Sequence, residues 1–235
     1  MLGLSRKRPG SEDEEHWISV SDLMSGLMVI FLFVAISYIR PVIEQREVVR
    51  EIAVAWQQSE LKLYERLNAE FSKDLANWGA EIDKETLSVR FKAPEILFDQ
   101  GKANLRPRFV EILNDFFPRY LTVLAEFRDA IDEVRIEGHT SSEWTGTNDP
   151  QLAYFRNMAL SQERTRAVLE HCLSLPAVGA ERDWAREHIT ANGLSSSKPI
   201  RSDAGDEDRD RSRRVEFRVR TNAKQQIVRI LEAVE

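Results

Sequence analysis

The sequence is poor in the residues that covalently braced or chemically reactive proteins use. Its 235 residues include one cysteine, so no disulfide can form within the chain and the folded part depends on its hydrophobic core. The four histidines show no metal-ligand spacing, and neither a phosphate-binding loop nor a nucleophile elbow is present. These absences predict a protein that is not an enzyme and that needs no metal and no cofactor.

Positive charge is also in short supply. The chain has 33 Lys and Arg residues against 39 Asp and Glu, and the net charge of −6 argues against nucleic acid as a direct partner. At this length the chain has room for one membrane helix and one ordinary domain of roughly 100 to 200 residues. Because 31% of the residues are charged, we expect most of the chain to be water-soluble.

Long apolar runs are absent except for one, residues 17–39, which reads WISVSDLMSGLMVIFLFVAISYI. A stretch of about 20 apolar residues suffices to cross a bilayer. We therefore expect residues 1–16 to be a cytoplasmic tail and residues 17–39 to be a transmembrane helix, followed by a domain on the far side. Three basic residues flank each side of the run, Arg6, Lys7 and Arg8 before it and Arg40, Arg46 and Arg50 after it, so charge alone does not decide the orientation. A very short amino terminus is easily retained in the cytoplasm while a folded domain is exported behind it, which favours this orientation. A cleavable signal peptide is the alternative, but the apolar region is too long for one.

Asp22 is the only charged residue in this apolar run. A carboxylate at such a position costs roughly 2.5 to 3.5 kcal/mol on insertion scales, so residues of this kind usually carry ions or protons, or meet a partner. Ser21 and Ser25 lie within one helical turn and can donate hydrogen bonds to the carboxylate; their alternative role is to let helices pack closely. The alternative for Asp22 is a position near the headgroups, or a cap on a helix that begins at Leu23.

Residues 40–80 are predicted to be a helical linker that ends at Gly79. Its apolar residues recur three, four or seven positions apart, at Val49, Ile52, Trp56, Leu63, Leu67, Phe71 and Leu75. This spacing fits a short coiled coil between two copies, although Ser59 and Arg66 interrupt the seam. It fits equally a single helix that packs on its own domain.

Residues 84–223 are predicted to form an α+β domain, and residues 224–235 a C-terminal helical tail. Alternating apolar residues predict strands near 87–91, 134–136, 189–191 and 215–219. Amphipathic segments predict a helix from Pro107 to Phe127, with a break or bend at Pro118, and a second helix from Leu152 to Leu173. The order β-α-β-α-β-β requires crossover connections, which favour a mixed sheet with helices on one face. Cys172 is expected to be a small buried residue.

The apolar segment resembles the B subunits of ion-driven stator motors. The pattern W-x-x-x-x-D-L-M-x-x-L-M of those subunits is filled by Trp17, Asp22, Leu23, Met24, Leu27 and Met28. The resemblance implies that Asp22 takes up an ion from one side of the membrane and releases it toward the other. A single acid makes H⁺ the simpler ion, and Na⁺ remains the alternative.

The part from Leu87 to Thr221 resembles the OmpA-like peptidoglycan-binding domain. The matching pieces are FDQGKANL at 98–105, VRIEGHT at 134–140, NMALSQER at 157–164 and RRVEF at 213–217. The resemblance implies a pocket for the peptidoglycan stem peptide lined by Asn157, Leu160 and Arg164, beside Thr140 and Ser141. A guanidinium suits the carboxylate of a stem-peptide diamino acid because it forms two parallel charge-assisted hydrogen bonds. The alternative for Arg164 is an ordinary surface residue.

The chain departs from the OmpA-like pattern at two positions. Ser141 stands where the family has an Asp that meets the ammonium group of the ligand, and Ser212 stands where an Asn is common. Glu143 or Asp149 could supply the missing negative charge, or both could be solvated. His139 is interpreted as a structural residue at the end of a strand.

Together the two resemblances imply a single-pass protein of the bacterial inner membrane, with a periplasmic domain that grips the cell wall. The short linker and the variant at residues 138–144 are more similar to the B subunit of the Zorya phage-defence system than to flagellar MotB. That similarity implies a dimer of this chain inside a ring of ZorA-like (MotA-like) subunits, which ion flow rotates. The alternatives are a flagellar stator, a passive wall anchor and a soluble periplasmic peptidoglycan binder.

Overall fold

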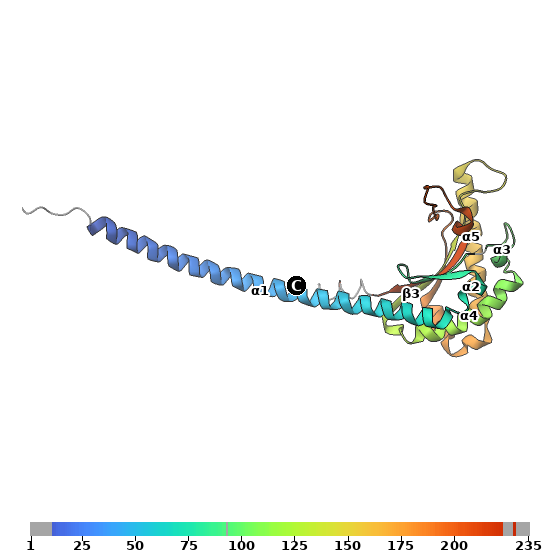
Figure 1. Ribbon diagram of the computed structural model, residues 1–235, viewed down its shortest axis with the longest axis horizontal. Coiled ribbons are helices and arrows are strands. Elements are labelled where there is room, and N and C mark those ends of the chain that lie inside the picture. Colours follow the sequence, from blue (N-terminus) through green and yellow to red (C-terminus); the bar gives the residue numbers. More distant parts are fainter. Residues whose placement is uncertain (1–10, 93, 223–227, 229–235) are drawn as a thin grey trace, which may run out of the picture. The chain divides into compact units, whose positions relative to one another are not determined.

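The computed structural model describes residues 11–92, 94–222 and 228 (Figure 1). The chain divides into a small unit built on residues up to Ile52 and a larger unit, Ala53–Ile230. Helix α1 (Ser11–Phe71) contributes residues to both. The first ten residues of the predicted cytoplasmic tail, and the predicted C-terminal tail apart from Val228, lie outside the described residues.

The amino-terminal part of α1 contains the predicted apolar segment. Asp22–Arg40 is long and apolar enough to cross a membrane, with a mean hydropathy of 2.1, and it is the one such helix among the residues described. Its side chains are exposed, as lipid-facing side chains must be. Because α1 begins at Ser11, Asp22 lies inside the helix and does not cap it. The alternative in which a helix begins at Leu23 is therefore wrong.

In the larger unit, the described residues form a five-stranded sheet in the order β1-β2-β5-β3-β4. The strands are β1 (Ala80–Asp83), β2 (Ser88–Phe91), β3 (Ile131–His139), β4 (Ile189–Gly193) and β5 (Arg214–Thr221). Strands β3 and β4 are parallel and the other neighbours are antiparallel. The predicted α+β class with a mixed sheet is confirmed, and all four predicted strands are present.

Strand β1 was not predicted. It lies at the end of the predicted linker and pairs with β2 across a tight connection at residues 84–87, with Asp83 opposite Ser88. All four of its side chains are only partly buried, because it is the edge strand. Its sequence, AEID, alternates apolar and polar residues, but it is only four residues long and contains Ala, Glu and Asp, which are uncommon in strands, so the pattern is too short to indicate a strand. Strand β1 extends the sheet to Ala80.

The long helices α4 (Pro107–Ala125) and α5 (Pro150–Ser174) cover one face of the sheet, as expected. The ring of Phe116 on α4 lies 5.2 Å from that of Phe91 on β2 and 5.0 Å from that of Phe217 on β5. At Gly193 a Cβ would lie 2.7 Å from the Cα of Gln162, so only glycine lets α5 approach the sheet this closely. The shorter helical elements are α3 (Pro94–Leu97), η1 (Arg128–Ala130), η2 (Pro176–Glu181), α6 (Arg182–His188) and α7 (Arg209–Ser212).

Helix α4 is continuous through Pro118, where we expected a break or bend. Proline inside a helix removes one hydrogen bond and costs about 3 kcal/mol. The side chains on both sides of it are fully buried in the core, among them Phe116, Phe117, Tyr120 and Leu121. Burial of each such side chain contributes roughly 1.5 to 3 kcal/mol, so packing outweighs the cost of the proline.

The carboxyl-terminal part of α1 belongs to the domain core. Leu63, Leu67 and Phe71 are at most 2% exposed, and the Phe71 ring lies 5.2 Å from that of Phe116. Arg66, which interrupts the apolar seam, donates two hydrogen bonds to the carboxylate of Glu126, at 2.9 and 2.6 Å. For this part of the linker, packing on its own domain is the correct alternative. Helix α2 (Leu75–Trp78) follows, and Gly79 ends it at a φ of 60°.

Candidate functional site

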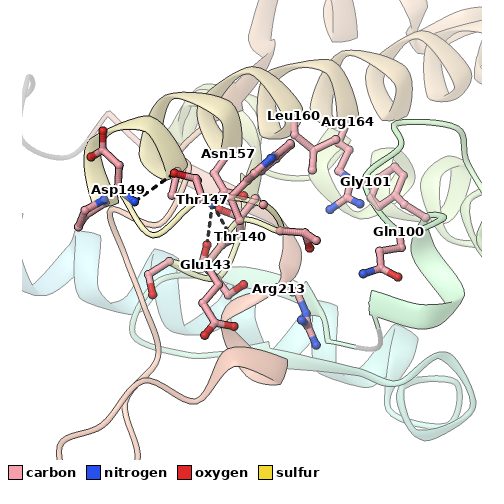
Figure 2. Close-up of a pocket in the computed structure, with 18 of the residues that line it drawn as sticks. Gln100, Gly101, Thr140, Glu143, Thr147, Asp149, Asn157, Leu160, Arg164 and Arg213 are labelled. Carbon is pink, nitrogen blue, oxygen red and sulfur yellow. Dashed lines mark hydrogen bonds between the residues drawn. The ribbon is translucent and has the colours of Figure 1, made fainter.

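A cavity of about 980 Å³ opens where β3 ends and α5 begins (Figure 2). It is lined by the loop at residues 140–150, the first turns of α5, the segment around Phe98 and Gly101, and Arg213. All five residues predicted to bind peptidoglycan line it: Thr140, Ser141, Asn157, Leu160 and Arg164. The fold thus brings together residues from separate sequence motifs.

Asn157 shapes the wall of the cavity. Its side chain is buried, and its Nδ2 donates hydrogen bonds to the backbone carbonyls of Ser141, at 3.1 Å, and Glu143, at 3.0 Å. Both amide hydrogens are therefore used within the protein. Asn157 holds the loop in place, and its direct contribution to a ligand is limited to the carbonyl oxygen.

Arg164 is a cation with no carboxylate partner among the described residues. Its Nε donates to the carbonyl of Lys102 at 2.9 Å and its Nη2 to the carbonyl of Asp99 at 3.2 Å, while the guanidinium lies 4.7 Å from the centre of the Phe98 ring. Burial, and secondly the charge of Arg213, lower the pKa of Arg164 to about 10. Arg164 is therefore partly buried and held by backbone carbonyls and an aromatic ring, unlike an arginine that extends freely into solvent.

Thr140 and Ser141 form the floor of the cavity directly after β3. Both are buried, and the backbone N–H of Thr140 donates to the carbonyl of Ser195 at 2.9 Å. The Oγ1 of Thr140 has no hydrogen-bond partner within the described structure. A buried hydroxyl without a partner is costly, so it favours a ligand that hydrogen-bonds to it.

The two acidic candidates have different surroundings. Asp149 caps α5, with its Oδ1 accepting from the backbone N–H of Gln151 at 2.9 Å. Glu143 is exposed at the rim, where its Oε1 lies 2.6 Å from Nη2 of Arg209. Because the cap fixes the carboxylate of Asp149 on the helix, whereas the ion pair of Glu143 is exposed and weak, Glu143 is the better placed of the two to meet a cationic ligand group.

Several residues that line the cavity had no role assigned from the sequence, among them Phe98, Trp144 and Arg213. Phe98 and Arg213 lie in the FDQGKANL and RRVEF pieces, so a signal for both existed in the sequence. Trp144 ends the variant at residues 138–144, which indicated the family but no binding role for this side chain. Figure 2 shows Arg164, Gln100 and Gly101 toward one end of the cavity, and Thr147 and Asp149 toward the other.

Glu137, His139 and Glu216 place their ligand atoms within 4.8 Å of one another on the polar face of the sheet. Oε1 of Glu216, however, accepts hydrogen bonds from Arg90 Nε at 2.9 Å and Arg214 Nε at 2.6 Å. Burial raises the pKa of Glu216, but the guanidiniums outweigh burial and hold it below its ordinary value. A carboxylate already neutralised by two cations is a poor metal ligand, so this group is an ion-pair network. His139 ends β3, as expected, and burial lowers its pKa.

The residues of the predicted ion path lie on α1, in the smaller unit. Asp22 and Ser25 are exposed and three positions apart, so they share one side of the helix. Ser21 is also on α1, but its side chain lies outside the described residues.

These features define the class of the protein: an α+β domain with a mixed sheet and a pocket at the end of β3, together with one apolar helix long enough to cross a membrane. No protein-family model matches the chain. The chain is 51% identical over 221 residues to the Zorya protein ZorB of Escherichia coli strain ATCC 8739, an alignment that covers 94% of both sequences. It therefore belongs to the ZorB family.

More distant relatives were also found. A ZorB protein of Escherichia coli O139:H28 is 24% identical over 93% of the chain and 85% of that protein. Among solved structures, a MotB-like protein from Desulfovibrio vulgaris is 27% identical with a TM-score of 0.48, over 73% of this chain and 94% of that one. The cell wall anchor of the T6SS from Pseudomonas aeruginosa is 25% identical with a TM-score of 0.45, over 66% and 96%.

Proposed function

We propose that this chain is the wall-anchored subunit of a proton-driven membrane motor that acts in Zorya anti-phage defence. Helix α1 spans the bacterial inner membrane with its amino terminus in the cytoplasm, and the domain binds peptidoglycan in the periplasm. Two copies of the chain lie inside a ring of ZorA-like subunits that rotates around them. Membership of the ZorB family supports the motor, and the pocket supports the anchor.

The observation that carries the anchor is Arg164 in its cavity. The stem peptide of peptidoglycan contains a diamino acid with a free carboxylate and a free ammonium group. Since Nε and Nη2 of Arg164 already donate to backbone carbonyls, the carboxylate binds at the end of the guanidinium that carries Nη1. The hydroxyl of Thr140 provides a further hydrogen bond. The ammonium group faces Glu143, which takes over the role of the Asp that Ser141 replaces.

Replacing Arg164 with alanine tests the anchor. A charge-assisted hydrogen bond contributes about 1.5 to 3 kcal/mol, so we expect binding to purified peptidoglycan to fall by about 10- to 100-fold. The measurement is cosedimentation of the full chain in detergent with peptidoglycan sacculi. Arg166→Ala, which removes an exposed arginine two residues away on α5, should leave binding unchanged. Equal binding of the wild type and Arg164→Ala, with folding intact by circular dichroism, would show that this pocket does not bind peptidoglycan.

The motor is supported by the lone carboxylate of the apolar segment. A carboxyl group in hydrocarbon favours the neutral form, and contact with a wet path lets it ionise, so one residue can exchange protons with both compartments. Each proton that crosses releases about 2.3 kcal/mol per 100 mV of membrane potential. This energy is available to turn the surrounding ring.

Asp22→Asn tests the motor, because the amide has nearly the same shape and no exchangeable acid. We expect phage protection in a plaque assay to be lost, while the amount in the membrane and copurification with the ring subunit stay unchanged. Ser37→Ala serves as the control in the same segment, since Ser37 only bonds back to the carbonyl of Phe33 at 2.8 Å. Full protection by Asp22→Asn would favour the second candidate, a passive wall anchor.

A further inference from the structure

The loop at residues 141–150 forms one wall of the cavity and is held in place by hydrogen bonds. Besides the two hydrogen bonds from Asn157, the backbone N–H of Ser142 donates to Glu207 Oε1 at 3.0 Å. Asp149 ties the end of the loop to α5 through its cap. A wall held at both ends presents its side chains to a ligand with little loss of conformational freedom.

The tip of this wall, residues 144–148, has the sequence WTGTN and carries no charge. All five of these residues line the cavity. Trp144 and Thr147 are joined in a short turn, with the N–H of Thr147 donating to the carbonyl of Trp144 at 3.4 Å. Gly146 has a φ of 89°, which glycine adopts without strain, and the guanidinium of Arg156 lies 6.0 Å from the centre of the Trp144 ring. The turn therefore holds an indole ring among neutral hydrogen-bonding groups.

The cavity is larger than a carboxylate site needs to be, and its lining includes more kinds of chemical group than such a site needs. Its volume of about 980 Å³ is at the upper end of the roughly 300 to 1,000 Å³ typical of pockets for whole small molecules. The charged residues of the lining are Arg106, Glu143, Asp149, Arg164 and Arg213, and the loop tip between Glu143 and Asp149 supplies an aromatic ring, two hydroxyls and an amide. This combination suits a neutral ring that presents C–H groups on its faces and hydroxyl and amide groups around its edge, such as a pyranose amino sugar.

We propose that residues 144–148 form a saccharide subsite that binds an amino-sugar ring of the peptidoglycan glycan strand. The inference rests on the proposed function, in which Arg164 binds the stem peptide. The stem peptide is attached to an amino sugar of the glycan, so a ligand held by its peptide at Arg164 carries a sugar ring with it. Trp144 stacks on one face of that ring, and Thr145, Thr147 and Asn148 hydrogen-bond to its edge.

The test compares two soluble probes by isothermal titration calorimetry with the full chain in detergent. One probe is the free stem peptide, and the other is the same peptide attached to its disaccharide. We expect the wild type to bind the disaccharide-peptide about tenfold more tightly, the order expected for one stacked ring. Trp144→Ala should abolish this difference and leave the affinity for the free peptide unchanged. Trp144→Phe should restore part of the difference.

Phe155→Ala is the matched control, because Phe155 is an exposed aromatic residue on α5, 60% exposed, that does not line the cavity. It should preserve the tenfold difference. Equal affinities of the wild type for the two probes would overturn the saccharide subsite and leave the proposed function standing. An equal loss for both probes in Trp144→Ala would also overturn it, since Trp144 would then only support the loop. Binding of neither probe by the wild type would overturn the proposed function and the subsite with it.

Discussion

Single residues in the pocket divide into those that hold its walls and those left for a ligand. Asn157 uses both amide hydrogens on the loop, and Asp149 uses its carboxylate on the helix cap. Within the part of the chain that the structure describes, Arg164 has no ion pair and the buried hydroxyl of Thr140 has no hydrogen-bond partner. The sequence placed all four near the ligand, but their separate tasks depend on which donors the fold consumes.

Glu143→Gln tests whether the carboxylate of Glu143 replaces that of the missing Asp. Glu143 is exposed at the rim, so we expect a loss of about two- to fivefold in affinity for the free stem peptide, largest at low salt. Calorimetry at two salt concentrations measures it. Asp149→Asn is the control, since asparagine caps a helix as well as aspartate does, and should change little. A loss of affinity in Asp149→Asn alone would show that Asp149, and not Glu143, contacts the ammonium group.

The secondary-structure elements show where local sequence patterns suffice. Strands with one buried face, such as Ser88–Phe91 and Arg214–Thr221, were predicted from their alternation. The edge strand Ala80–Asp83 was missed, since its alternation of Ala80 and Ile82 with two acidic residues is only four residues long and directly follows a helical pattern. The continuity of α4 through Pro118 was missed because it depends on packing against the sheet, which no local preference records.

Leu67→Ala tests whether the carboxyl-terminal end of α1 is part of the domain core. Leu67 is fully buried, so its truncation should lower the free energy of unfolding by about 2 to 5 kcal/mol. Urea unfolding of the full chain in detergent, followed by tryptophan fluorescence, measures the change. Leu61→Ala removes a leucine that is 39% exposed on the same helix and should cost less than about 0.5 kcal/mol. Equal effects of the two variants would show that this part of α1 is not held in the core.

At the scale of the whole molecule, the two proposed activities lie in separate units of the chain. Asp22 belongs to the smaller unit and Arg164 to the larger one. Asp22→Asn should therefore abolish protection without changing peptidoglycan binding, and Arg164→Ala should weaken binding without changing membrane insertion. A motor subunit needs both, because an ion path without an anchor does no work on its surroundings.

The stability of the whole domain should depend on pH through its ion-pair network. The folded state holds the pKa of Glu216 below its ordinary value of 4.5, since Arg214 and Arg90 outweigh burial. As the pH falls, the Glu216 carboxylate therefore takes up its proton at a higher pH in the unfolded chain than in the folded one. The stabilisation that this carboxylate provides above about pH 4.5 is lost as the pH falls below that value. Circular dichroism of urea unfolding between pH 7 and pH 3 should show this loss.

Glu216→Gln should lower the free energy of unfolding at pH 7 by about 3 kcal/mol, because it leaves the buried guanidinium of Arg214 without its ion-pair partner, and should flatten the acid dependence. Arg90 keeps its ion pairs with Glu81 and Asp83. Glu163→Gln, at an exposed position on α5, should keep the wild-type profile. If the free energy of unfolding of Glu216→Gln depended on pH as that of the wild type does, carboxylates other than Glu216 would be responsible for the pH dependence.

The sequence by itself determined the apolar segment, the α+β class, the main strands and helices, and the residues of the binding motif. The first three follow from local composition or periodicity, because a membrane span, a strand face and an amphipathic helix leave their requirements in neighbouring residues. The residues of the binding motif follow instead from the resemblance to the OmpA-like domain. Only the tertiary structure decided that the end of α1 joins the core, that Ala80–Asp83 adds an edge strand, and which pocket groups keep free donors. These depend on partners far apart in the chain, such as Arg66 with Glu126 and Asn157 with Ser141, whose meeting is set by packing and not by any local pattern.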